Sequence, residues 1–299
     1  MTGFSDLQAL EAESIHILRE AAAEFQKPAI LYSIGKDSSV MLCLAQKAFA
    51  PAPIPFVFLH VDTSYKFPEM LEFRERRARE TGISLIVHRN EEALAEGANP
   101  FRLGLERCCH LLKTQALKDA LREHGIDAAI GGSRREEERS RAKERIFSIR
   151  DVYGQWDPKR QRTEVWNLYN CRLAKDQTMR VFPLSNWTEL DVWEYIRREK
   201  ISVVDLYFAK PRPTVLRNGR LLPAYHDLPL EPGEKVEMIM SRMRSIGCTY
   251  CSGAIRSQAE TIDQIVEEVR QFRTSERQNR LIDHDQDASM ERKKREGYF

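Results

Sequence analysis

Short apolar runs alternate with longer amphipathic segments along the first half of the chain. Continuous apolar runs are typical of parallel strands whose two faces are both covered by helices. We predict such strands near residues 29–33, 56–61, 84–88 and 127–131. Apolar residues at helical spacing predict helices near residues 7–25, 38–49, 67–81 and 109–124. This alternation predicts the α/β class, with a doubly wound and mostly parallel sheet.

The second half of the chain has fewer strand signals and several aromatic residues. One further helix is predicted from Thr188 to Glu199, because Asn186-Trp187-Thr188 supplies an N-terminal cap. We expect the sheet domain to occupy residues 1–200. Residues 201–299 are expected to form a C-terminal extension that is mainly helical or irregular.

The 299 residues carry a formal net charge of +2. So small a charge favours neither a general nucleic-acid coat nor the binding of acidic substrates over the whole surface. The longest apolar stretch, around Ile54 to Val61, is too short to span a bilayer, and the acidic N-terminus does not resemble a signal peptide. We therefore expect a cytoplasmic protein that has no membrane partner. Six cysteines in an intracellular chain favour thiols or metal ligands over disulfides.

The segment Ser33-Ile34-Gly35-Lys36-Asp37-Ser38 follows a predicted strand and opens a predicted helix. Backbone N–H groups of such a turn and the positive end of the helix point at one place, where Lys36 and the two serine hydroxyls add donors. This arrangement predicts a phosphate site. It is not a Walker A loop, because Ile30 and Asp37 occupy the positions where that loop needs Gly and Ser or Thr.

The same segment resembles the Ser-Gly-Gly-Lys-Asp-Ser loop of the N-type ATP pyrophosphatases, with Ile34 in place of the first glycine. The resemblance implies that Ser33, Gly35, Lys36, Asp37 and Ser38 bind the β,γ-pyrophosphate of ATP, with Mg²⁺, and leave the α-phosphorus open to a nucleophile. The products would be an adenylate and pyrophosphate.

Ligands of doubly wound sheets bind beyond the carboxyl ends of the strands. The turns His60-Val61-Asp62-Thr63 and Gly131-Gly132-Ser133 are therefore expected beside the phosphate loop. Asp62 could hold the nucleotide ribose or a magnesium ion, or it could be a solvated turn residue that caps the next helix, and the sequence leaves both readings open. Gly131 and Gly132 would let the backbone approach a ligand closely.

A strongly charged block follows this diglycine and runs to Arg150. Alternating charges usually mark a solvated helix face. Here the block follows a sheet strand on the phosphate side, and guanidinium groups bind oxyanions such as sulfate or the α-phosphate with two parallel hydrogen bonds. We therefore select Arg134 and Arg135, with Lys36, as candidate catalytic cations.

The resemblance becomes close when longer motifs are included. The phosphate loop, the turn at residues 60–63, the block at residues 131–150, Trp156-Asp157-Pro158-Lys159, residues 180–188 and the tail from Ser275 to Phe299 resemble the small subunits of heterodimeric bacterial sulfate adenylyltransferases. The resemblance implies an adenine nucleotide alpha hydrolase-like fold, with residues 1–200 as the nucleotide-binding domain. It also implies conversion of ATP and sulfate to adenylyl sulfate and pyrophosphate, with a GTPase large subunit as partner.

Four cysteines depart from that family's usual pattern. Cys108-Cys109 and Cys248-Thr249-Tyr250-Cys251 form two close pairs on either side of residues 110–247. Four thiolates from two such pairs can hold an iron–sulfur cluster or zinc. The pairs resemble the cluster ligands of bacterial adenylyl-sulfate reductases, which implies a 4Fe-4S cluster; zinc or plain thiols are the alternatives. A reductase is not expected, because that family attacks with a cysteine near its C-terminus and Cys251 is the last cysteine here.

Two other functions compete with sulfate activation. Iron–sulfur ATP pyrophosphatases of DNA phosphorothioation or tRNA thiolation activate a nucleic-acid oxygen for sulfur insertion, with a cysteine desulfurase as partner. The cysteines favour that alternative, whereas the longer motifs favour sulfate. A regulatory protein that merely binds nucleotide is the third possibility, and the intact Gly35-Lys36-Asp37-Ser38 argues against it.

Overall fold

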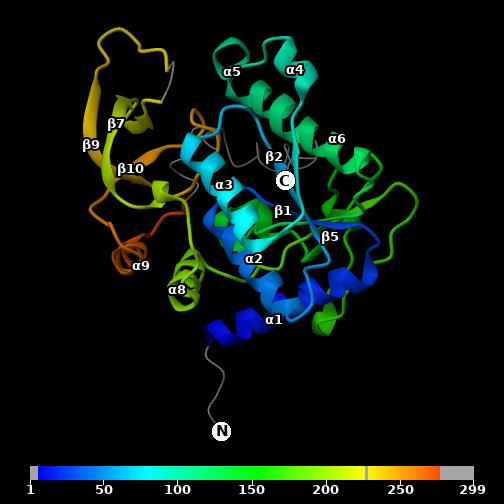
Figure 1. Ribbon diagram of the computed structural model, residues 1–299. Coiled ribbons are helices and arrows are strands. Elements are labelled where there is room, and N and C mark those ends of the chain that lie inside the picture. Colours follow the sequence, from blue (N-terminus) through cyan, green and yellow to red (C-terminus); the bar gives the residue numbers. More distant parts are fainter. Residues whose placement is uncertain (1–5, 226–227, 277–299) are drawn as a thin grey trace.

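A computed structural model of the chain describes residues 6–225 and 228–276 (Figure 1). Its centre is a six-stranded sheet with the strand order β3-β2-β1-β4-β6-β5. The strands are β1 (Pro28–Leu31), β2 (Val57–Val61), β3 (Leu85–His88), β4 (Ala128–Ile130), β5 (Phe147–Arg150) and β6 (Thr178–Val181). Neighbours pair in parallel, except that β5 is antiparallel to β6. The winding reverses between β1 and β4, which is where open α/β sheets bind ligands.

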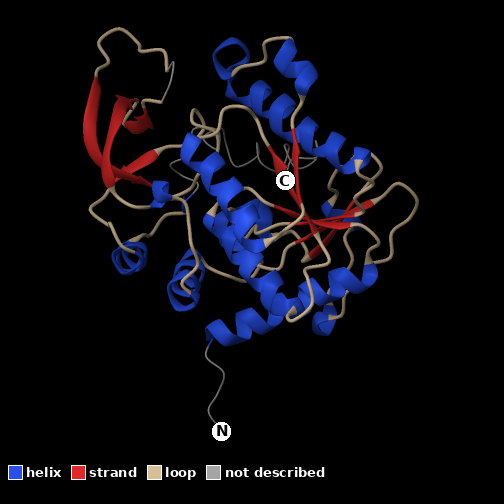
Figure 2. Cartoon of the chain, in the orientation of Figure 1, coloured by secondary structure: helices blue, strands red, loops and turns tan. Residues whose placement is uncertain are grey.

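Helices cover both faces of this sheet (Figure 2). The α-helices of the described residues are α1 (Asp6–Glu24), α2 (Lys36–Phe49), α3 (Pro68–Thr81), α4 (Glu91–Ala95), α5 (Pro100–Cys109), α6 (Ala116–Glu123), α7 (Arg139–Ala142), α8 (Glu189–Glu199) and α9 (Ile262–Gln271), of which α9 lies beside the barrel rather than on the sheet (Figure 1). A π-helical segment, His110–Gln115, joins α5 to α6, and short 3₁₀ turns span Arg135–Glu137, Pro158–Arg160, Val165–Asn167 and Asp205–Tyr207. Among the described residues, no helix has the length and apolar character needed to cross a membrane.

Alternate residues of the strands enter two separate cores. Ile30 and Phe58 pack with α1, α2 and α8 on one face, whereas Ala29 and Leu59 pack with Leu117 of α6 on the other. This alternation is the reason why the strands read as continuous apolar runs, since both faces are buried. The doubly wound, mostly parallel sheet is confirmed.

The four predicted strands and the predicted helices are present, with ends that differ by a few residues. Strands β5 and β6 were not predicted. Each carries a buried arginine, Arg150 and Arg180, so neither strand shows a continuous apolar run. The helix predicted over residues 109–124 is interrupted, because its first half is the π-helical segment.

The C-terminal part differs from our expectation of a mainly helical or irregular extension. Within it, β7 (Lys210–Arg217), β8 (Arg220–Pro223), β9 (Val236–Met243) and β10 (Ala254–Arg256) close into a small antiparallel barrel, drawn in yellow and orange beside the sheet in Figure 1. The sequence did not predict β7, because Pro211 and Pro213 lie within it and proline normally argues against a strand interior. Helix α9 follows, and Ile239 and Met243 of the barrel join the core that α2 and α8 share.

Candidate active site

A cavity of about 200 Å³ opens at the carboxyl edge of the sheet. Residues after β1, β2 and β4 line it, as the fold class predicts. Seven residues that the sequence analysis assigned to the nucleotide site line this cavity: Ser33, Gly35, Lys36, Asp37, Ser38, Gly131 and Gly132. The structure therefore brings together the phosphate loop and the diglycine, although they lie far apart along the chain.

The N-terminus of α2 faces this cavity. Its N-cap residue is Gly35, which has no side chain to accept hydrogen bonds from the first helical turn. The Lys36 N–H donates to the Tyr207 hydroxyl, and the N–H groups that follow it and the positive end of the helix dipole attract anions. The Ser38 and Ser39 hydroxyls instead donate to the Gly35 carbonyl, at 2.9 and 3.1 Å. Ser38 therefore stabilises the loop in this structure, whereas we expected its hydroxyl to point at the phosphate.

Two backbone features shape the loop. Ile34 has a φ of 68°, in the left-handed region that is costly for a β-branched side chain and free for glycine. This is the position where ATP pyrophosphatases carry their first glycine. Gly132 packs against the first turn of α2, where a Cβ would lie 3.0 Å from the Cβ of Asp37. The diglycine thus allows close approach to the phosphate loop itself.

Lys36 is buried beside two carboxylates. Its Nζ contacts Glu276 and lies 3.2 Å from Asp37, and its side chain is only 1% exposed. Burial alone would lower the pKa of the Lys36 ammonium, but Asp37 and Glu276 raise that pKa well above its usual value. Lys36 is therefore a permanent cation at the cavity wall.

Arg134 and Arg135 lie in different surroundings. The Arg134 guanidinium is 1% exposed and contacts Asp37 through Nε at 2.9 Å and Glu276 through Nη2 at 2.6 Å. Arg135 instead donates to the Asn186 side chain in a more exposed position. Neither is among the described residues that line the cavity. Arg134 thus contacts the loop through Asp37 from outside the cavity lining, and Arg135 contacts Asn186, just before α8.

Other side chains line the cavity that the sequence analysis did not select. Lys66, Lys113 and Arg141 add positive charge, and Tyr207 and Glu276 enter from the C-terminal part. Arg141 belongs to the charged block, so the sequence could have indicated it as a cavity residue. Lys113, Tyr207 and Glu276 carry no local signal, because only the fold brings them to the loop.

Asp62 follows β2 but does not appear among the described cavity residues. Its carboxylate accepts hydrogen bonds from Arg89 at 2.7 Å and from the Ser64 backbone at 2.9 Å, and Arg74 lies 3.6 Å away. Burial opposes ionisation, yet these donors hold the pKa of Asp62 below its usual value. Asp62 is nevertheless buried, and the N-cap residue of α3 is Phe67, so the reading of Asp62 as a solvated residue that caps the next helix is wrong.

His60, in β2, also lines the cavity and is 1% exposed. Its Nδ1–H donates to the Tyr32 carbonyl at 2.7 Å, which fixes the neutral tautomer. Burial, followed by the charge of Lys66, lowers the pKa of His60 to about 3. His60 is therefore uncharged at neutral pH.

The four selected cysteines lie together. Cys108, Cys109, Cys248 and Cys251 line one small cavity, and the Sγ atoms of Cys109 and Cys251 are 3.8 Å apart. Tyr250 also lines this cavity, and its ring packs edge to face against Phe101, with ring centroids 4.6 Å apart. The cluster adjoins the nucleotide cavity, because Ser245, Ile246 and Gly247 line that cavity and directly precede Cys248.

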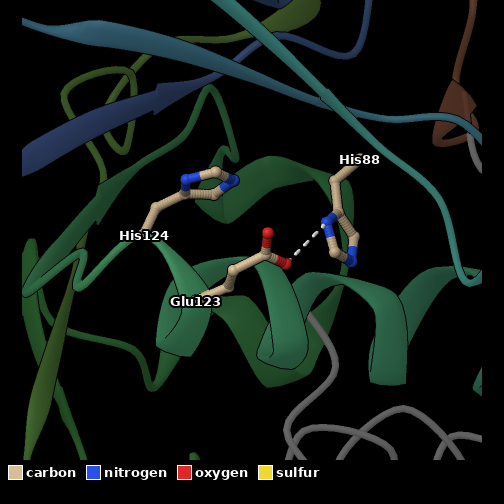
Figure 3. Close-up of side chains that lie close together, drawn as sticks. All are labelled: His88, Glu123 and His124. Atoms are coloured by element: carbon tan, nitrogen blue, oxygen red, sulfur yellow. Dashed lines mark ion pairs between the residues drawn. The ribbon is translucent and has the colours of Figure 1, made fainter.

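A second group of potential metal ligands lies at the end of α6. Donor atoms of His88, Glu123 and His124 are within 4.8 Å of one another (Figure 3). The Glu123 side chain is 63% exposed and faces His88 Nδ1 at 3.6 Å. These features describe a surface ion pair, and none of the three residues lines the nucleotide cavity among the residues described there.

Comparisons with known proteins show which proteins this chain is similar to. Residues 27–254 match the family model of the phosphoadenosine phosphosulfate reductase domain. Sulfate adenylyltransferase subunit 2 of Myxococcus xanthus is 59% identical over 296 residues, covering 99% of this chain and 97% of the relative. The protein of the same name from Akkermansia muciniphila is 57% identical, covering 99% and 98%. A crystal structure of phosphoadenylyl-sulfate reductase from Candida auris has a TM-score of 0.47 and 17% identity, covering 68% of this chain and 91% of that one.

Proposed function

The chain belongs to the sulfate adenylyltransferase subunit 2 family, and we propose from that premise that it transfers the adenylyl group of ATP to sulfate and releases pyrophosphate. The similarity over nearly the whole chain carries the choice of acceptor. The start of α2, whose N-cap residue Gly35 has no side chain, and the Lys36 side chain at the cavity wall support the nucleotide site. Activation of a nucleic-acid oxygen has no comparable support, because the relatives named above are both sulfate adenylyltransferase subunits.

The proposed step needs no redox partner. A sulfate oxygen attacks the α-phosphorus, a bond between them forms, and the bond to the bridging oxygen of the β-phosphate breaks. Pyrophosphate leaves with that electron pair, so negative charge grows on the leaving group. We propose that Lys36, which lines the cavity, and the N-terminus of α2 stabilise this charge. Arg141 and Lys113, also at the cavity wall, would hold the remaining anionic oxygens.

We propose Mg²⁺ as the companion of the triphosphate, because this ion binds through substrate phosphates and one or two carboxylates. Two carboxylates at the cavity wall could bind this ion. Asp37 belongs to the phosphate loop, and Glu137 belongs to the charged block.

We propose that the partner is a GTPase large subunit. The names of the relatives contain the word subunit, which supports the presence of a second chain.

We also propose a domain boundary near residue 200, since the sheet strands precede it and the barrel strands follow it.

For the cysteines, we propose a 4Fe-4S cluster held by Cys108, Cys109, Cys248 and Cys251. The donor set fits, because four thiolates facing one cavity select iron–sulfur clusters or zinc over harder ions. The rings of Tyr65 and Tyr250 line the cavity and would limit access of water. Within the adenylation step, these residues would act by holding Gly247 and its neighbours in place at the cavity wall.

The function is tested by combining the full chain with a GTPase large subunit, MgATP and sulfate. We expect release of pyrophosphate that depends on sulfate, with adenylyl sulfate as the second product. Release that is independent of sulfate would contradict the proposed acceptor. The Lys36→Ala chain in the same complex is the matched control for release by contaminating enzymes.

A further inference from the structure

Four buried or half-buried charges lie in contact at the phosphate loop. Asp37 bridges Lys36 Nζ, at 3.2 Å, and Arg134 Nε, at 2.9 Å. Glu276 bridges the same two cations from the other side, with one carboxylate oxygen on Lys36 and the other on Arg134 Nη2 at 2.6 Å. Glu136 adds a third carboxylate, 3.5 Å from Arg134 Nη1, so carboxylates surround both cations. Lys36, the cation of this group at the cavity wall, already contacts two of them.

Glu276 reaches this position from the far end of the described chain. Three consecutive residues fasten the segment that carries it. The Thr274 carbonyl accepts from Arg244 Nη2 at 2.7 Å, and the Ser275 hydroxyl donates to the Glu137 carbonyl at 2.7 Å. Glu276 itself is 5% exposed and lines the nucleotide cavity. The tertiary fold thus places this carboxylate at the phosphate loop, although Glu276 and the loop lie far apart along the chain.

Glu276 binds Lys36 through one carboxylate oxygen and so uses a donor that a phosphate oxygen in the cavity would use, while Arg134 holds its other oxygen. Burial would raise the pKa of Glu276, but Lys36 and Arg134 hold it well below its usual value, so Glu276 is an anion at neutral pH. An incoming anion must therefore compete with it. The N-terminus of α2 and the other cavity cations remain as additional contacts, which a large anion can reach simultaneously and a small one cannot.

We propose that Glu276 is a specificity-determining residue that occupies the anion position of the phosphate loop, so that polyphosphates displace it and small oxyanions such as phosphate and sulfate do not. The inference rests on the proposed function in one respect, namely that the polyphosphate is that of ATP. Its consequence for the reaction is that sulfate is kept out of the pyrophosphate position.

The test is direct binding of inorganic phosphate, sulfate and pyrophosphate to the full-length chain, measured by calorimetry. Glu276→Gln removes the competing charge and keeps the size of the side chain. We expect phosphate and sulfate to bind at least tenfold tighter to this variant, and the preference for pyrophosphate over phosphate to fall. Glu267→Gln on the exposed face of α9 is the matched control and should bind all three anions as the wild type does.

Unchanged or weaker phosphate binding by a folded Glu276→Gln chain would overturn the inference. If that variant does not fold, Glu276→Asp serves instead, because it keeps the charge and shortens the reach to Lys36 and Arg134. We expect phosphate to bind several-fold tighter to Glu276→Asp, and equal binding would again overturn the inference. The proposed function can fail separately, since a chain without sulfate-dependent activity could still show the altered anion binding.

Discussion

The hydroxyl of Tyr207 accepts a hydrogen bond from the backbone N–H of Lys36 at 2.8 Å. Tyr207 lies in the C-terminal part, and Lys36 is the first residue of α2. The phosphate loop is therefore held by a residue that follows α8, far from the loop along the chain. The same hydroxyl is 3.4 Å from the position of a Cβ on Gly35, so it also limits the size of the N-cap residue.

The first prediction follows from this bond. Tyr207→Phe leaves the Lys36 N–H without its partner in a buried place, which costs about 1–3 kcal/mol of unfolding free energy. Urea unfolding of both chains measures the loss. Tyr153→Phe, on an exposed side chain, is the control and should change the free energy of unfolding very little. Equal stability of Tyr207→Phe and wild type would contradict a structural role for this bond.

The second prediction concerns Lys36 in catalysis. Lys36→Ala removes a cation at the start of α2, and the lost stabilisation of the leaving group should be on the order of 2–4 kcal/mol. The rate of pyrophosphate release should then fall by roughly two to three decades. Steady-state assays of the complex with sulfate measure this. Near-wild-type turnover would remove Lys36 from the mechanism.

The third prediction separates the two neighbouring arginines. Arg134→Lys keeps the charge but cannot bridge Asp37 and Glu276 as the guanidinium does, so we expect a loss of about 2–4 kcal/mol in unfolding free energy and a large loss of activity. Arg135→Lys should leave stability nearly unchanged, because its contact with Asn186 is exposed. A strong loss of activity in a stable Arg135→Lys chain would instead support our earlier choice of Arg135 as a catalytic cation.

The fourth prediction concerns pH. The pKa of His60 is about 3 in the folded chain and 6.5 in the unfolded one, so between these values only the unfolded chain binds the proton. The folded state is therefore fully favoured above pH 6.5 and loses stability as the pH falls towards 3. From pH 7 to pH 5 the loss should be about 2 kcal/mol.

Unfolding of wild type and His60→Gln at both pH values measures this dependence. The His60→Gln chain should lose about 2 kcal/mol less than the wild type over the same interval, whatever its stability at pH 7. His16→Gln replaces a half-exposed histidine and serves as the control. An identical pH dependence in all three chains would show that His60 does not titrate as its burial predicts.

The fifth prediction concerns the cysteine cluster. If the four cysteines hold a 4Fe-4S cluster, anaerobically prepared protein should be brown and contain about four irons per chain. Serine at Cys108, Cys109, Cys248 or Cys251 should remove or weaken the cluster, whereas Cys43→Ser should not. Iron analysis and absorbance measure both. A colourless, iron-free and fully active protein from iron-replete cells would contradict the cluster.

Some of this architecture follows from local sequence. The apolar runs predict β1 to β4 because both faces of these strands are covered. Gly35 and small polar residues before an apolar helix predict the phosphate loop. Strands β5 and β6 escaped prediction for the opposite reason. Arg150 and Arg180 are buried there, and Arg150 is neutralised by Glu144 from outside its strand.

The amino-acid sequence by itself determined the α/β class, the phosphate loop, the diglycine and the two cysteine pairs, because each depends on neighbouring residues or on a pattern with a fixed period. Only the tertiary structure decided that Tyr207 and Glu276 hold the loop, that Arg134 supports it while Arg135 does not, and that the cysteines adjoin the cavity. Contacts between residues far apart along the chain depend on where the whole fold brings them, and no local pattern records that position.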